Sequence, residues 1–66
     1  MDMPSTVIKK FAYNSKKERL YVTFLSGKVY AYLNVPENVY EEMKEAFSKG
    51  KFLNENIKGK YAFKAV

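Results

Sequence analysis

The sequence contains neither cysteine nor histidine among its 66 residues. Disulfide bonds and metal sites built on thiolate or imidazole are therefore excluded. A catalytic base would have to be a carboxylate or a lysine, and the glutamates concentrate on one stretch where they are expected to be solvated. We expect no enzyme, no cofactor, no metal and no small-molecule substrate. Because the absence of cysteine fits a reducing compartment, we expect a cytoplasmic protein.

Long apolar runs are also missing, so no segment is long enough to cross a bilayer and no membrane partner is expected. The N-terminus lacks the basic start and apolar run of a secretory signal. The length allows one domain at most, which we assign to residues 5–66 after a flexible tail at residues 1–4. Such a short chain is stable by roughly a few kcal/mol. Its six Tyr and five Phe residues must supply much of the core.

Alternating apolar residues predict three consecutive strands, at residues 5–13, 19–25 and 28–33. Pro36 then begins an amphipathic helix, and Gly50 is the natural residue to cap its end. Residues 51–57 could then form a short turn or a single helical turn that packs Phe52, Leu53 or Ile57 onto the core. A final alternating segment follows at residues 60–66. The predicted fold class is α+β: a three-stranded antiparallel meander, one amphipathic helix packed on it, and a short C-terminal edge strand.

The turn between the second and third strands decides which face carries Tyr30 and Tyr32. A two-residue turn would place both beside Tyr21, away from the core, as a stacking platform for bases. A three-residue loop at residues 25–27 would instead turn both into the core. We favour the longer loop, because Ser26 suits neither type of two-residue hairpin turn. The predicted core combines apolar residues of these strands and the helix: Leu20, Val22, Phe24, Tyr30, Tyr32, Val39, Tyr40, Met43 and Phe47.

The formal charge of +5 is unevenly distributed. Residues 37–45 contain four glutamates and one lysine, whereas residues 49–64 contain five lysines and one glutamate. A basic segment with interspersed aromatic and amide side chains can neutralise phosphates and stack on bases, which favours RNA binding. The same residues also fit a solvated edge strand whose lysines discourage edge pairing and keep the domain soluble. The candidate RNA-binding residues are Lys49, Lys51, Phe52, Asn54, Lys58, Lys60, Tyr61, Lys64, Lys9 and Lys10.

An ordered set of short motifs runs through most of the chain. They are Ser26-Gly27-Lys28-Val29-Tyr30-Ala31-Tyr32, Val35-Pro36, Val39-Tyr40, Ser48-Lys49-Gly50-Lys51-Phe52-Leu53-Asn54 and Ile57-Lys58-Gly59-Lys60-Tyr61. In this set the chain resembles the KTSC domain family, which is named for its occurrence at the C-terminus of some lysyl-tRNA synthetases. The resemblance implies an RNA-related role through that fusion. Relatives often carry a charged residue between the two tyrosines, where this chain has Ala31, and a charge there agrees with an outward-facing position.

Two functions from different classes follow from these patterns. The first is a small RNA-binding module that recognises tRNA-like or single-stranded RNA through its basic C-terminal surface. The alternative is a protein-interaction or oligomerising adaptor, suggested by the acidic helix face and the aromatic content. Tyr21, Val29 and Ala31 would then form an apolar patch that a protein partner covers.

Overall fold

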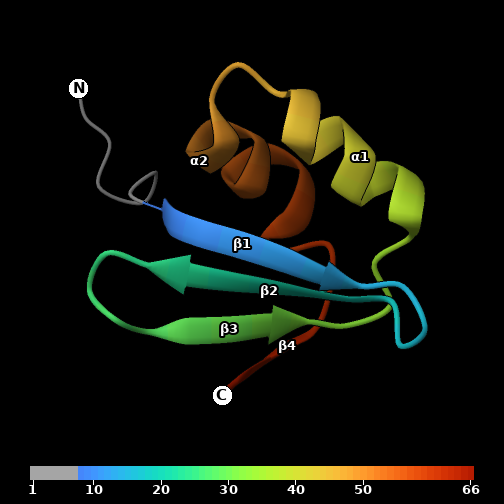
Figure 1. Ribbon diagram of the computed structural model, residues 1–66, viewed down its shortest axis with the longest axis horizontal. Helices are drawn as coiled ribbons and strands as arrows, with labels where there is room; N and C mark the ends of the chain where they lie inside the picture. The colour runs from blue at the N-terminus through green and yellow to red at the C-terminus, as the bar shows by residue number, and fades with distance from the viewer. Residues whose placement is uncertain (1–7) are drawn as a thin grey trace.

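The computed structural model describes residues 8–66 and contains one antiparallel sheet with helices on one of its faces (Figure 1). The strand order is β1-β2-β3-β4. The strands are β1 Ile8–Asn14, β2 Arg19–Phe24, β3 Val29–Tyr32 and β4 Phe63–Ala65. The helical segments are α1 Glu37–Glu45, α2 Lys49–Phe52 and the π-helical turn η2 Leu53–Ile57. The predicted α+β class is confirmed, while the predicted tail at residues 1–4 and the start of the first strand lie outside the described residues.

The loop between β2 and β3 has the three-residue form. The Gly27 amide donates to the Phe24 carbonyl at 2.8 Å, and the Phe24 amide donates to the Lys28 carbonyl at 2.9 Å. Gly27 has a φ of 97°, a left-handed conformation that glycine adopts without steric cost. Because side chains alternate along each strand, this loop turns Tyr30 and Tyr32 towards the helices, as predicted.

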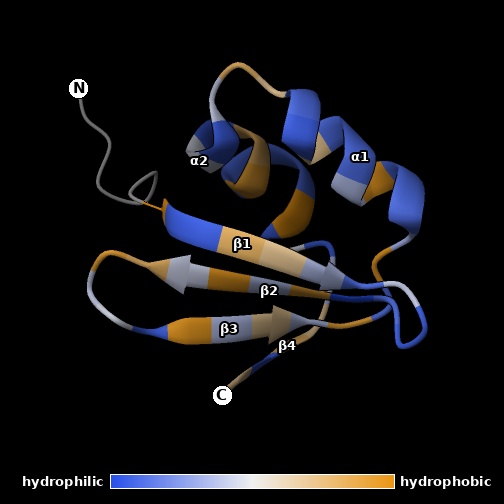
Figure 2. Cartoon of the chain, in the orientation of Figure 1, coloured by the Kyte–Doolittle hydropathy of each residue, from blue (hydrophilic) through white to orange (hydrophobic). Residues whose placement is uncertain are grey.

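The core lies between the sheet and the helices. Its fully buried members come from β2, β3, the connection between β3 and α1, α1 and η2: Leu20, Val22, Tyr32, Val35, Met43, Leu53 and Ile57. The predicted core residues Phe24, Tyr30, Val39 and Tyr40 are half-buried and pack against this cluster. The outward side of α1 is largely hydrophilic (Figure 2). No helix within residues 8–66 is both long and apolar enough to span a bilayer.

The prediction that Phe47 belongs to the core is wrong, because its side chain is fully exposed. α1 ends at Glu45, and the next residue, Ala46, is extended with φ −66° and ψ 140°. The Ala46 amide donates to the Met43 carbonyl at 3.1 Å. Phe47 follows the apolar spacing of the helix in the sequence, but the helix ends before reaching it.

The sequence predicted that Gly50 caps the end of α1. Instead, Gly50 is buried inside the second helix, α2. Ser48 starts that helix, since its hydroxyl accepts a hydrogen bond from the Lys51 amide at 3.2 Å. Residues 51–57, predicted as either a short turn or a single helical turn, are therefore helical down to residue 57. This extension places Leu53 and Ile57 in the core, where both are completely buried.

Candidate nucleic-acid interface

The predicted RNA-binding residues occupy three separate parts of the molecule. One group lies on α2 and η2: Lys49, Lys51, Phe52 and Asn54. A second group lies in the turn between η2 and β4: Lys58, Lys60 and Tyr61. The third group lies on the two outer strands of the sheet: Lys9 and Lys10 on β1, and Lys64 on β4.

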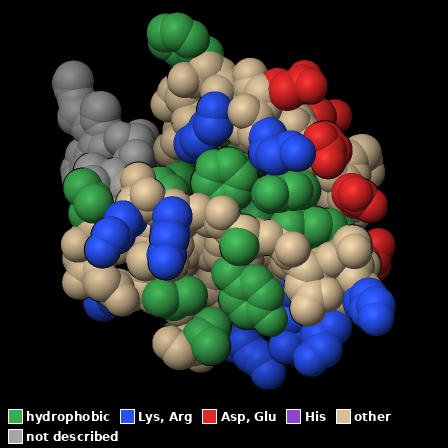
Figure 3. Space-filling model, viewed as in Figure 1, with side chains coloured by type: hydrophobic (Ala, Val, Ile, Leu, Met, Phe, Trp, Pro, Cys, Tyr) green, Lys and Arg blue, Asp and Glu red, His purple; other side chains and the backbone are tan. Residues whose placement is uncertain are grey.

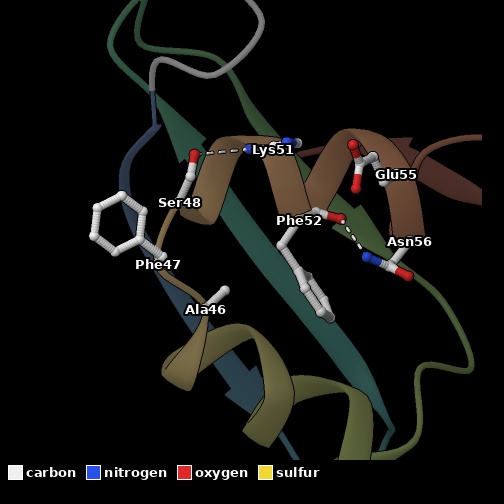
Figure 4. Close-up of a pocket in the computed structure, with 7 residues that line it drawn as sticks. All are labelled: Ala46, Phe47, Ser48, Lys51, Phe52, Glu55 and Asn56. Atoms are coloured by element: carbon white, nitrogen blue, oxygen red, sulfur yellow. Dashed lines mark hydrogen bonds between the residues drawn. The ribbon is translucent and has the colours of Figure 1, made fainter.

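In the helical group, only Lys51 presents a fully exposed charge. The Lys49 ammonium donates to the Ala46 carbonyl at 2.8 Å, which satisfies an acceptor just past the end of α1. Phe52 is half-buried against the core, and its ring points into the space between α1 and α2 (Figure 4). Asn54 is half-buried in η2. This group contributes one exposed lysine and the edge of one aromatic ring.

A shallow open pocket of about 280 Å³ is lined by the connection between α1 and α2, by α2 and by η2 (Figure 4). Its lining residues are Ala46, Phe47, Ser48, Lys51, Phe52, Glu55 and Asn56. The Asn56 side chain donates to the Phe52 carbonyl at 3.3 Å, while the Phe47 ring stands at the side of the pocket. The lining mixes one cation, one carboxylate and two aromatic rings, so it selects no particular anion.

The turn group exposes two lysines around Gly59, whose φ is 82°. The Lys58 amide donates to the Leu53 carbonyl at 2.9 Å, which anchors the turn to η2. Tyr61 is half-buried and packs against the core, so its ring is only partly available to a ligand. Lys58 and Lys60 are therefore the accessible charges of this turn.

The sheet group contains residues on the face that no helix covers. Lys10 pairs with Thr23, Tyr21 pairs with Ala31, and a bulge between Ile8 and Lys10 sets this register. Arg19 and Tyr21 share this face with Lys10, yet neither was among the candidate residues. The alternation of side chains along β2 identifies Arg19 and Tyr21 as residues of this face. Because Leu20 and Val22 face the core, their neighbours in the strand must face away from it.

The tyrosines that face the helices have structural roles. The Tyr13 hydroxyl donates to the Val35 carbonyl at 2.6 Å, and its ring stacks on Tyr40 with centroids 4.8 Å apart. Burial raises the pKa of Tyr13, with smaller contributions from the charges of Glu18 and Glu37. Burial likewise raises the pKa of Tyr32. Both phenols therefore stay protonated and neutral near pH 7.

Acidic side chains are concentrated on one part of the surface. They gather over α1, while basic side chains lie over the sheet, its turns and part of the helical layer (Figure 3). On α1, the Lys44 ammonium lies 3.2 Å from the Glu41 carboxylate and 5.1 Å from the centre of the Tyr40 ring. The hydrogen bond that Lys44 donates to Glu41 raises the pKa of Lys44. Within residues 8–66, no three acidic side chains come together in a group suited to a metal ion.

The Tyr30-Ala31-Tyr32 segment lies in β3, the strand between β2 and β4. A family model for the KTSC domain matches residues 4–61, which includes this segment. The chain belongs to the KTSC domain family. A crystal structure of a KTSC domain protein from Yersinia pestis has the same fold, with a TM-score of 0.88 and 30% identity. That match covers 100% of this chain and 93% of the other.

Curated relatives of this KTSC domain include much longer proteins. Lysine–tRNA ligases from Nostoc punctiforme and Trichormus variabilis are 46% and 42% identical over 61 and 59 residues. These matches cover 92% and 89% of this chain but only 11% and 10% of the ligases. The KTSC domain thus spans about a tenth of the length of these relatives and is similar to one small segment of each.

Proposed function

We propose that this KTSC domain is a non-catalytic RNA-binding module, with transfer RNA as the class of RNA it recognises. The observation that carries the proposal is the likeness of about nine-tenths of the chain to a short segment of two lysine–tRNA ligases. A segment of that size within a tRNA-dependent enzyme is well suited to hold the RNA while other parts perform the chemistry.

The distribution of charge supports this proposal. Exposed lysines at residues 10, 51, 58, 60 and 64 surround the sheet and the second helix, whereas four of the glutamates are on α1. Lysines that neutralise phosphates release bound counterions, and this release supplies most of the affinity in non-specific RNA binding. The acidic side of α1 would face away from the RNA, because like charges repel.

The proposal is tested by fluorescence anisotropy with unfractionated tRNA, titrated at several salt concentrations. Affinity is expected to fall steeply as salt rises, in proportion to the number of phosphates that the domain neutralises. The double variant Lys58→Glu/Lys60→Glu is expected to bind more than tenfold more weakly. The matched control Lys16→Glu/Lys17→Glu makes the same charge change in the turn between β1 and β2 and is expected to lose less. If the unmodified domain does not bind tRNA at low salt, the proposal fails.

The alternative function as a protein-interaction domain has one specific feature in its favour. Phe47 is fully exposed beside the pocket between α1 and α2, and a partner that covered it would bury a large apolar ring. The patch expected from Tyr21, Val29 and Ala31 exposes less apolar surface to a protein partner, because Ala31 is buried. This function predicts self-association or complex formation that Phe47→Ser abolishes, measured by analytical ultracentrifugation. A protein that sediments as a monomer at all concentrations, with or without the substitution, contradicts the oligomerising form.

A further inference from the structure

One tyrosine differs from the other five in where it lies. Tyr32 is buried in the core, and four others pack against the core: Tyr13, Tyr30, Tyr40 and Tyr61. Tyr21 lies on the opposite face of the sheet, with its neighbours Leu20 and Val22 facing the core. Among the described residues it has neither a hydrogen-bond partner for its hydroxyl nor an aromatic ring packed on it. Its half-buried ring therefore lies outside the core.

The residues beside Tyr21 are small. Ala12 pairs with it from β1 and Ala31 from β3, and directly opposed residues have side chains about 5 Å apart. Among residues 8–66 the helices all lie on the other side of the sheet, so none of them crosses this face (Figure 1). Ala31 is only 1% exposed, so the β3 side of Tyr21 is covered, whereas Ala12 is exposed and leaves room for a planar ring on the β1 side.

Three cations share the face of Tyr21, and the described strands contribute no acid to it. Lys10, Arg19 and Lys64 occupy positions on the same face, and Lys64 pairs with Ala31 in the row that contains Tyr21. None of the three forms an ion pair with another described residue. The four strands of the sheet contain no aspartate or glutamate. An anion that approaches this face would meet attraction from three sides of the tyrosine.

We propose that this open face of the sheet binds single-stranded RNA, with an unpaired base stacked on Tyr21 and the flanking phosphates held by Lys10, Arg19 and Lys64. The accessible part of the ring can stack on any base, because every base has a π-face, while nearby cations follow the backbone. A wholly apolar protein partner would leave the three cations without counter-charges. This inference rests on the proposed RNA-binding function and specifies the part of an RNA that is recognised, namely a loop or an end in place of a duplex.

The decisive experiment compares Tyr21→Leu with Tyr21→Phe, using labelled 12-nucleotide oligouridine and a 12-base-pair RNA duplex as probes. Tyr21→Leu keeps an apolar side chain in the strand but removes the ring, so its affinity for the single strand is expected to fall roughly 5- to 100-fold. Tyr21→Phe keeps the ring and is expected to bind as the unmodified domain does. The duplex has no unpaired bases, so neither substitution should change its binding by more than about twofold.

A second pair of variants tests the cations independently of the ring. Lys10→Gln/Arg19→Gln should reduce the slope of log affinity against log salt by about 0.7 for each phosphate that the variant no longer neutralises. Lys16→Gln/Lys17→Gln removes the same charge outside this face and should change the slope less. Circular dichroism melting checks that each variant is folded at the assay temperature.

The outcomes separate this inference from the function on which it rests. If the unmodified domain binds oligouridine but Tyr21→Leu binds equally tightly, the open face is not the stacking site, although RNA binding stands. If Tyr21→Leu loses the single strand and the duplex to the same extent, the ring is not acting through an unpaired base. If the unmodified domain binds none of the probes, namely oligouridine, the RNA duplex and tRNA, at low salt, the proposed function itself is wrong.

Discussion

Removing one hydroxyl group, by Tyr13→Phe, tests how the first strand is attached to the rest of the fold. The Tyr13 hydroxyl donates to the Val35 carbonyl at 2.6 Å, across 22 positions of sequence. Val35 lies at the junction between β3 and α1, with a fully buried side chain, and its amide donates to the Glu18 carbonyl at 2.8 Å. The substitution keeps the stack on Tyr40 and changes only the hydrogen bond.

The expected loss in the free energy of unfolding is about 1 kcal/mol, the usual net value of a neutral hydrogen bond, and about 2 kcal/mol if the Val35 carbonyl is left without water. In a domain of this size, each kcal/mol corresponds to roughly 4–8 °C in the melting temperature. Tyr13→Leu also removes the stack on Tyr40 and should cost about 0.5–1.5 kcal/mol more.

The assay is urea denaturation monitored by circular dichroism, which gives the free energy of unfolding of each variant and its dependence on urea concentration. Tyr21→Phe is the matched control, because it also removes one phenolic hydroxyl but no hydrogen bond among the described residues, and it should change stability by less than about 0.5 kcal/mol. Equal losses for Tyr13→Phe and Tyr21→Phe would refute the assigned bond, and so would a stability unchanged by Tyr13→Phe.

Two further predictions concern the core and its titration. Met43 is completely buried, so Met43→Ala should destabilise the domain by about 2–5 kcal/mol and leave little folded protein, whereas Phe47→Ser should cost less than about 0.5 kcal/mol. Chemical denaturation of both variants checks this contrast, and similar losses would contradict the exposed position of Phe47. Because the pKa values of Tyr13 and Tyr32 are raised in the folded domain, their stabilising contribution is complete below about pH 10, where unfolded tyrosine ionises, and is lost as the pH rises through the folded values. The free energy of unfolding, measured from about pH 8 to about pH 12, should therefore fall above roughly pH 10. The fall should be less steep in Tyr32→Phe than in the unmodified domain. An equal slope in these two proteins would contradict the assignment of the fall to Tyr32.

Much of the sheet could be predicted from the sequence, because its signals are local. Alternation of side chains identifies β2 and β3, and the requirement for a left-handed residue at Gly27 selects the three-residue loop. That loop in turn fixes the pairing of Tyr30 with Val22 and so the role of the central tyrosines. Local steric rules are sufficient at each of these steps, which is why residues 19–33 folded as predicted.

The helical half could not be predicted to the same degree. The apolar spacing from Val39 to Phe47 fits one helix, but the chain leaves the helix at Ala46 and starts another at Ser48. The break allows Leu53 and Ile57 to reach the core, where both are fully buried. Periodicity describes one helix at a time and cannot weigh the exposure of Phe47 against the burial of two aliphatic side chains further along.

The sequence by itself determined the charge, the absence of thiol and imidazole chemistry, the strand pattern and the turn that buries Tyr30 and Tyr32. Only the tertiary structure decided which cations lie together. Lys10 and Lys64 are far apart in the chain and on opposite edges of the sheet, yet they share its open face with Tyr21. Lys49 and Lys51 are close to each other in sequence, but their surroundings differ. Lys49 donates a hydrogen bond to the Ala46 carbonyl, whereas Lys51 is exposed. Strand pairing joins residues that are distant in sequence, and a side chain's surroundings depend on those pairings as much as on its neighbours along the chain.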